Sequence, residues 1–243
     1  MSTATTQTQT PARDDVATTS RSHPDQARAA QPSRLWAASG VAAAVTGIGA
    51  IVATMGMSAV YNPETSGNAD KILDVMLTDK GPSTAFHVLA ATSALLLVPF
   101  AAGLFRRLRS TLPVDSLLPA VAAMGLAMTS VILVMGSGLD TEFGSGIPDK
   151  GYVVAENVSF YGHWVGTIPY LWTGVGLAGL ALFVAALRHG AVPRWMGIVG
   201  LVLGGVTVVA GVSPMEYMAG MTGPLWLLVT AAGFALGDRA QRR

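Results

Sequence analysis

Two histidines lie near the ends of long apolar runs, where an ionisable side chain is unusual. His87 lies in the stretch "STAFHVLAA" and His163 in "FYGHWVG", and we expect both at a similar depth on the same side of a membrane. An ionisable residue inside a membrane span is costly to hold there, so it is a candidate functional residue. The alternative for each is a histidine satisfied by water or by a neighbouring backbone carbonyl, because polar groups cost less near the headgroups than at the bilayer centre.

Acidic and aromatic side chains are expected at the same level. The candidate catalytic residues are Asp140, Glu142 and Glu216, and their alternative is a solvated position in a loop that borders water. A convergence of histidine, carboxylate and aromatic groups would form an outward-facing pocket. The candidate ligand-binding residues are His87, His163, Tyr161, Trp164, Tyr170, Trp172 and Tyr217.

Three kinds of chemistry fit these residue types, and the cofactor is left unknown. His87 and His163 could ligate one haem iron between two helices. Methionines could join the histidines as soft ligands for Cu(I), although methionine is also an ordinary gap-filler in helices. A carboxyl group kept protonated by apolar surroundings could act as a general acid on a lipophilic substrate, as a membrane terpene cyclase requires, with aromatic faces stabilising the carbocation. The candidate copper ligands besides the histidines are Met215 and Met218, with Met55, Met57 and Met221 nearby.

The composition indicates a membrane protein and excludes several classes. Of 243 residues, 51% are hydrophobic and 12% charged, whereas soluble domains carry about 25% charged residues. The net charge of +1 argues against a nucleic-acid partner, and the absence of cysteine excludes disulfides, zinc–thiolate sites and iron–sulfur clusters. No P-loop, HExxH or GxSxG pattern is present.

Six runs without Asp, Glu, Lys or Arg predict six membrane spans, because about 20 apolar residues in a helix cross the hydrocarbon core. The expected fold is all-α, a polytopic bundle of six transmembrane helices with both termini inside and a short amphipathic outer helix. We expect a disordered cytoplasmic tail over 1–33, the transmembrane domain over 34–238 and a basic cytoplasmic C-terminus over 239–243. The six runs are 35–63, 81–105, 116–139, 157–187, 195–215 and 217–237.

The cations predict the orientation of these spans. Alternation from an inner N-terminus places twelve arginines inside and only Lys71, Lys80 and Lys150 outside. By the positive-inside rule, this bias predicts a cytoplasmic N-terminus and C-terminus in the plasma membrane. The inner residues are Arg13, Arg21, Arg28, Arg34, Arg106, Arg107, Arg109, Arg188, Arg194, Arg239, Arg242 and Arg243.

Connections and small residues add detail to this bundle. Asn68 could cap a surface helix whose apolar face holds Ile72, Val75 and Met76, lying on the membrane. The Gly-rich segment 136–159 is expected to fold as a loop over the outer mouth, and Pro99 and Pro169 are expected to kink their spans. Glycines at helical spacing permit close packing: Gly40, Gly47, Gly174, Gly176, Gly179, Gly197, Gly200 and Gly204.

Two segments carry a resemblance to a known family. One span ends in "LFRRLR", and "GLALFVAALRHGAVPRWMGIVGLVLGG" links two spans through a Pro-Arg-Trp loop. This order resembles a family of six-span integral membrane proteins of unknown function, common in actinobacteria, over roughly residues 35 to 237. The resemblance implies the same topology and brings no catalytic residues.

The sequence thus predicts an integral membrane protein that binds a small lipophilic molecule or acts as an accessory or interaction subunit. The alternatives are a membrane enzyme with an outward-facing acid and aromatic pocket, or a haem- or copper-binding membrane protein. The predicted partners are the lipid bilayer and a lipophilic small molecule or another membrane protein, without nucleic acid.

Overall fold

Six apolar helical segments make up the fold. The computed structural model describes residues 34–78, 80–145 and 153–237, and contains no strand within them. The predicted all-α bundle of six spans is confirmed, while the direction of crossing stays a prediction. Residues 1–33 and 238–243, the two predicted tails, lie outside the described residues. The segments long and apolar enough to cross a membrane are Leu35–Met55, Gly81–Arg109, Leu118–Phe143, Ala155–His189, Arg194–Gly211 and Tyr217–Leu236.

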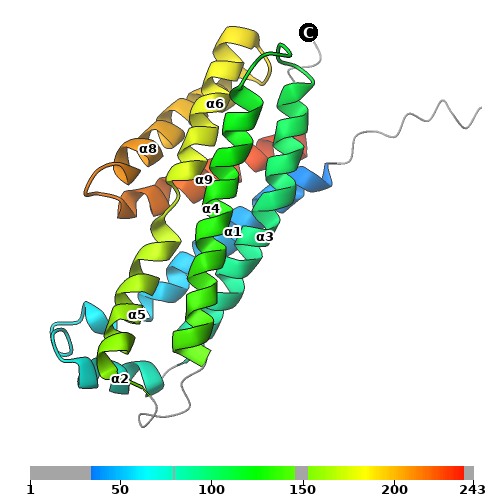
Figure 1. Ribbon diagram of the computed structural model, residues 1–243. Coiled ribbons are helices and arrows are strands. Elements are labelled where there is room, and N and C mark those ends of the chain that lie inside the picture. Colours follow the sequence, from blue (N-terminus) through cyan, green and yellow to red (C-terminus); the bar gives the residue numbers. More distant parts are fainter. Residues whose placement is uncertain (1–33, 79, 146–152, 238–243) are drawn as a thin grey trace, which may run out of the picture. The chain divides into compact units, whose positions relative to one another are not determined.

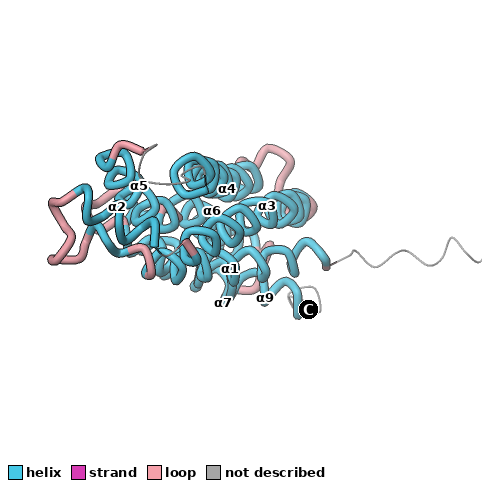
Figure 2. The backbone as a smooth tube through the Cα atoms, turned by 90° about the horizontal axis from the view of Figure 1, so that it is seen from below, coloured by secondary structure: helices cyan, strands magenta, loops and turns pink. Residues whose placement is uncertain are grey.

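Neighbouring spans pack in a defined order (Figure 1). The first, α1, contacts α3 and α9; α3 contacts α4, and α4 contacts α6, which packs against the fifth span. The short helix α2 lies beside α5 at one end of the bundle (Figure 2). The helices are α1 (Leu35–Met55), α2 (Ala69–Thr78), α3 (Gly81–Arg109), α4 (Leu118–Asp140), α5 (Ala155–Thr167), α6 (Thr173–His189), α7 (Arg194–Val199), α8 (Gly205–Gly211) and α9 (Tyr217–Leu236).

Short irregular helices complete these elements. The 3₁₀-helices are η2 (Ser58–Val60) and η5 (Ile168–Tyr170), and the π-helical turns are η3 (Thr141–Ser145) and η6 (Gly200–Gly204). The π-helical turn η3 extends α4 beyond Asp140, and η6 joins α7 to α8 in the fifth span.

Pro169 interrupts the fourth span, whereas Pro99 does not interrupt the second. The helix α5 ends at Thr167, and α6 begins only at Thr173, after η5 and two non-helical residues. Proline lacks an N–H and clashes with the preceding turn, so it disfavours a continuous helix. The indole Nε1 of Trp172 donates to the Pro169 carbonyl at 2.8 Å, which satisfies a backbone group near the break. Pro99 lies within the continuous helix α3.

Glycines bring the backbones of adjacent spans together, as predicted. A Cβ atom at Gly125 of α4 would overlap the carbonyl oxygen of Gly174 in α6, and one at Gly174 would overlap the Gly125 carbonyl oxygen. On the other side of α6, a Cβ at Gly179 would lie 2.9 Å from the Cα of Gly204. Close approach of this kind gives membrane helices their van der Waals contact without a strong hydrophobic drive.

The helix α2 is capped as predicted. The backbone N–H of Lys71 donates to Asn68 Oδ1 at 3.0 Å, which satisfies one donor of the first turn.

Its buried face agrees with the predicted one at Ile72 and at the partly buried Met76, but includes Leu73 in place of Val75. Ile72 and Leu73 are buried, whereas Val75 is 48% exposed. Ile72 packs with Val60 of η2, and Leu73 packs with Val158 of α5. The apolar face of α2 therefore covers other parts of the protein, because η2 and α5 offer it an apolar surface. This correction makes α2 part of the bundle.

Segment 136–159 is mostly helical where it is described, in contrast to the predicted loop. The helix α4 continues to Asp140, η3 follows, and α5 begins at Ala155; residues 146–152 lie outside the described residues. The helix extends this far because its last residue is held inside the protein by side chains of α3 and α5.

Candidate functional site

Asp140 is the centre of the candidate site. Asp140 is the last residue of α4, and its exposed fraction is 0%, so the alternative of a solvated loop position is wrong. The hydroxyl of Ser83 donates to Asp140 Oδ1 at 3.0 Å, and the hydroxyl of Tyr161 donates to the same oxygen. The two hydroxyl oxygens are 3.2 Å apart. A buried carboxyl group needs such partners, because transfer of a charge out of water is costly unless hydrogen bonds compensate it.

Three helices place these groups. Ser83 is in the first turn of α3, where Pro82 supplies a preformed helical start. Tyr161 is in the middle of α5, and its ring stacks on Phe143 with centroids 5.7 Å apart. The site therefore joins the beginning of the second span to the end of the third and the beginning of the fourth.

His87 lies one turn after Ser83 on α3 and approaches the other oxygen of Asp140. Its Nδ1 is 3.3 Å from Asp140 Oδ2 and 3.0 Å from the carbonyl oxygen of Ser137. Because a carbonyl only accepts hydrogen bonds, this geometry requires the hydrogen of the ring to be on Nδ1. The side chain of His87 is 37% exposed, so it connects the buried carboxyl group to the surface.

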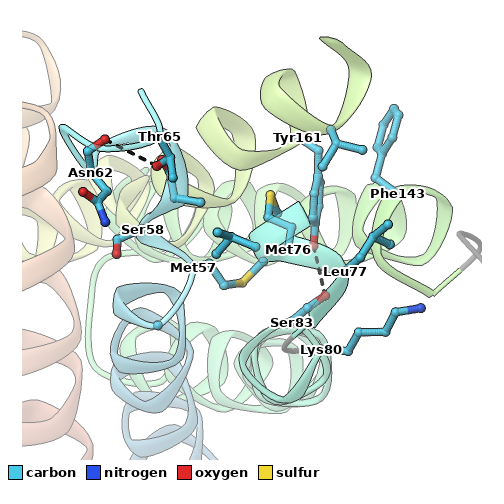
Figure 3. Close-up of a pocket in the computed structure, with 14 residues that line it drawn as sticks. Met57, Ser58, Asn62, Thr65, Met76, Leu77, Lys80, Ser83, Phe143 and Tyr161 are labelled. Atoms are coloured by element: carbon cyan, nitrogen blue, oxygen red, sulfur yellow. Dashed lines mark hydrogen bonds between the residues drawn. The ribbon is translucent and has the colours of Figure 1, made fainter. Parts of the chain in front are cut away.

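A cavity of about 170 Å³ adjoins Ser83 and Tyr161 (Figure 3). Asp140 is not among its lining residues, whereas Ser83 and Tyr161, whose hydroxyls donate to Asp140, both line it. Most of the remaining wall is apolar, with two methionines across the middle. The lining residues are Gly56, Met57, Ser58, Ala59, Asn62, Thr65, Val75, Met76, Leu77, Lys80, Ser83, Phe143, Val158 and Tyr161.

A second polar cluster gathers three of the predicted ligand-binding residues around Tyr61. The ring of His163 meets the ring of Tyr61 edge-on with centroids 5.5 Å apart, and the rings of Tyr170 and Tyr217 are 5.2 Å apart. The hydroxyls of Thr167 and Tyr217 lie 3.3 Å apart. Partial burial, together with the hydrogen bond between Tyr61 and Tyr217, raises the pKa of Tyr61 to about 12.

The remaining sequence candidates have other surroundings. Trp172 is fully buried and packs in the main core, so its contacts are structural. Trp164 is half-buried beside Phe160. Glu142 is exposed, and Glu216 is half-buried just before α9. Neither acid lines the cavity.

The histidines belong to different clusters. His87 contacts Asp140 and His163 contacts Tyr61, while the candidate ligands Met215 and Met218 are exposed along a groove formed with α8. Among the described residues, no group of three or more His, Asp or Glu side chains is placed to hold a metal ion. The haem and copper hypotheses stay predictions.

The sequence did not indicate Ser83 as a site residue, and it placed Met76 only on the apolar face of α2 and not in a cavity wall. One signal was available: Ser83 and His87 are four residues apart, which places them on one face of a helix. Nothing in the sequence paired that face with Asp140.

No family model, curated protein or solved structure matches this chain. The resemblance to a six-span actinobacterial family stays a prediction.

Proposed function

We propose that this integral membrane protein binds a small amphipathic molecule in the cavity beside α2, with the polar group of the molecule on Ser83 and Tyr161. The observation that carries the proposal is the fully buried carboxyl group of Asp140, whose two hydroxyl partners form part of the cavity wall. Buried polar networks are costly to assemble, and a cavity beside one offers a ligand both apolar contact and directed hydrogen bonds.

The size and location of the cavity limit the ligand. At about 170 Å³ it is smaller than the pockets of roughly 300–1,000 Å³ that hold drug-sized molecules. It lies beside the beginning of the second span and the end of the third, and in our proposal this end of the bundle is at the level where headgroups meet hydrocarbon. A short chain with one polar end fits both constraints.

The proposed location is the plasma membrane, with the N-terminus in the cytoplasm. Six described arginines, Arg34, Arg106, Arg107, Arg109, Arg188 and Arg194, belong to the loops and helix ends opposite the cavity, whereas Lys71 and Lys80 belong to the cavity end. By the positive-inside rule, this distribution supports an outward-facing cavity.

A second candidate is an enzyme that uses Asp140 as a general acid. The contact of Asp140 with His87 and Tyr161 favours it: the imidazole would give a proton to the carboxyl group, and the carboxyl group would give one to the Tyr161 hydroxyl as that hydroxyl passes its own hydrogen to the substrate. For an enzyme, Asp140→Asn would abolish turnover and leave ligand binding in place.

Binding of 1-hexanol to the protein in lipid nanodiscs tests the proposal. We expect calorimetric titration to give saturable heat after subtraction of the heat from empty nanodiscs. Met76→Trp should abolish this signal, because Met76 lies across the middle of the cavity (Figure 3). The control is Met55→Trp, which places the same side chain at a position 63% exposed and outside the cavity wall. Equal binding by both variants would refute the cavity as the site.

A further inference from the structure

We propose that the polar group of the ligand is a protonated amine, held by Ser83 Oγ and Tyr161 Oη in front of the Asp140 carboxylate. This inference rests on the proposed function and names the chemical class of its ligand.

The first reason for a protonated amine is the set of hydrogen-bond donors and acceptors in the cavity wall. A serine or tyrosine hydroxyl has one hydrogen to donate. Ser83 and Tyr161 both donate theirs to Asp140 Oδ1. What they present to the cavity is lone pairs, which accept hydrogen bonds. A ligand group at this position must therefore donate, as an ammonium or an alcohol does and a carboxylate does not.

The charge of the carboxyl group gives the second reason. Asp140 Oδ2 is buried and has no hydrogen-bond partner among the described residues. Its nearest cationic candidate is His87 Nδ1 at 3.3 Å, and that nitrogen is closer to the Ser137 carbonyl, at 3.0 Å. A negative charge on Asp140 is thus incompletely matched by the protein, and a cationic ligand would complete the match. An ammonium on the two hydroxyls would lie roughly 4–6 Å from the carboxylate, where attraction between charges is strong in a site shielded from water.

The other polar groups of the wall do not oppose a cation at this position. Among the lining residues that the structure describes, Lys80 is the one cationic side chain, and it extends away from Ser83 and Tyr161 (Figure 3). Ser58, Asn62 and Thr65 lie on the opposite side of the cavity (Figure 3). The space between is bordered by Met57, Met76 and Leu77, which suit an alkyl chain.

Aromatic rings add to the attraction for a cation. Tyr161 lines the cavity, and its ring stacks on Phe143, which also lines it. A cation within about 6 Å of such a ring is attracted by the negative face of its π-system. The same wall therefore offers an ammonium group lone pairs, a nearby carboxylate and aromatic rings.

Three probes with the same six-carbon chain test the ligand class. Hexylamine, 1-hexanol and hexanoate are titrated at pH 7 into the full-length protein in nanodiscs of neutral lipid, with empty nanodiscs subtracted. We expect hexylamine to bind about tenfold more tightly than hexanol, and hexanoate about tenfold more weakly than hexanol, which is the range a single screened charge interaction provides.

Variants locate the origin of the preference. In the double variant Ser83→Ala with Tyr161→Phe, and in Asp140→Asn, the amine and the alcohol should bind within about twofold of each other. The matched control is Ser58→Ala, which removes a hydroxyl from the opposite side of the cavity and should retain the preference. If Asp140→Asn does not fold, the order of affinities of the three probes for the wild-type protein still tests the ligand class, and the double variant still tests its position.

The outcomes separate this inference from the proposed function. Equal binding of amine and alcohol to the wild type, abolished by Met76→Trp, overturns the ligand class and leaves the proposed function standing. A preference for amine that survives in the double variant overturns the assigned position. Absence of binding by all three probes overturns the inference and the proposed function together.

Discussion

The two halves of the fourth span use opposite means of packing. On the α5 side of the break at Pro169, side chains meet: Tyr161 reaches Asp140 of α4, and a cavity remains beside them. On the α6 side, backbones meet through Gly125 and Gly174, with no space for a Cβ atom. The fourth span thus combines a tightly packed half with a half that has room for a ligand.

This difference explains why a carboxyl group can be buried at the end of α4. The contact of α4 with α6 holds α4 in place by van der Waals packing, so that its last residue is brought against α3 and α5. Polar groups there are arranged by a scaffold that does not depend on them. The two halves should therefore respond differently to substitution.

The largest effect is expected from Asp140→Ala in the α5 half. The substitution leaves the buried hydroxyl donors of Ser83 and Tyr161 without their acceptor, and removes the carboxyl group beside His87. Breaking a buried ionic or charge-assisted network by removal of one partner costs about 3–5 kcal/mol. We expect a loss of this size in the free energy of unfolding, measured by denaturant titration in mixed micelles. Glu142→Ala, two residues further on and exposed, should change it by less than about 0.5 kcal/mol. Equal losses would show that Asp140 is not an acceptor in a buried network.

A smaller effect is expected from Gly125→Ala in the α6 half. The added methyl group overlaps the Gly174 carbonyl, and backbone cannot move aside as a flexible side chain can. Overpacking of this kind costs about 1–3 kcal/mol. The control is Gly138→Ala on the same helix, where a Cβ meets nothing within 4 Å; it should be neutral or stabilising by up to about 1 kcal/mol because alanine favours helix. Thermal unfolding in nanodiscs measures both, and a Gly125→Ala protein as stable as its control would contradict the backbone contact.

The sequence predicted the α6 half better than the α5 half. Runs without charged residues predicted the spans, and glycines at helical spacing, such as Gly174 and Gly179, predicted close packing. Both patterns can be recognised within the sequence of a single helix. The Asp140 site depends on partners 57 and 21 residues away, and no local pattern encodes such a meeting. A charged residue at the end of an apolar run also indicates the end of a span, so the sequence predicts that Asp140 lies in the loop that follows.

The smallest effect on stability is expected at Tyr61, which is 52% exposed, whereas Asp140 is fully buried. The ring of Tyr61 packs against Gly166 of α5. A Cβ atom at Gly166 would clash with this ring, at 2.8 Å from Tyr61 Cε2. Its pKa is raised to about 12 from an ordinary value of 10.0, first by partial burial and then by the hydrogen bond with Tyr217.

The raised pKa predicts a loss of stability at high pH. Between pH 10 and 12 the unfolded chain has released the Tyr61 proton while the folded protein still holds it. Folding then takes up a proton, so the free energy of unfolding contributed by this group, fully present below pH 10, falls as the pH rises towards 12. The loss should be small, because Tyr61 is 52% exposed and solvent weakens such effects. Titration of tyrosinate absorbance in wild type and Tyr61→Phe measures it: the variant should lack a late ionisation step and show a shallower fall in stability over that range. Identical titration curves would mean that Tyr61 ionises like a solvated tyrosine, and the contrast between the two clusters would then rest on Asp140 alone.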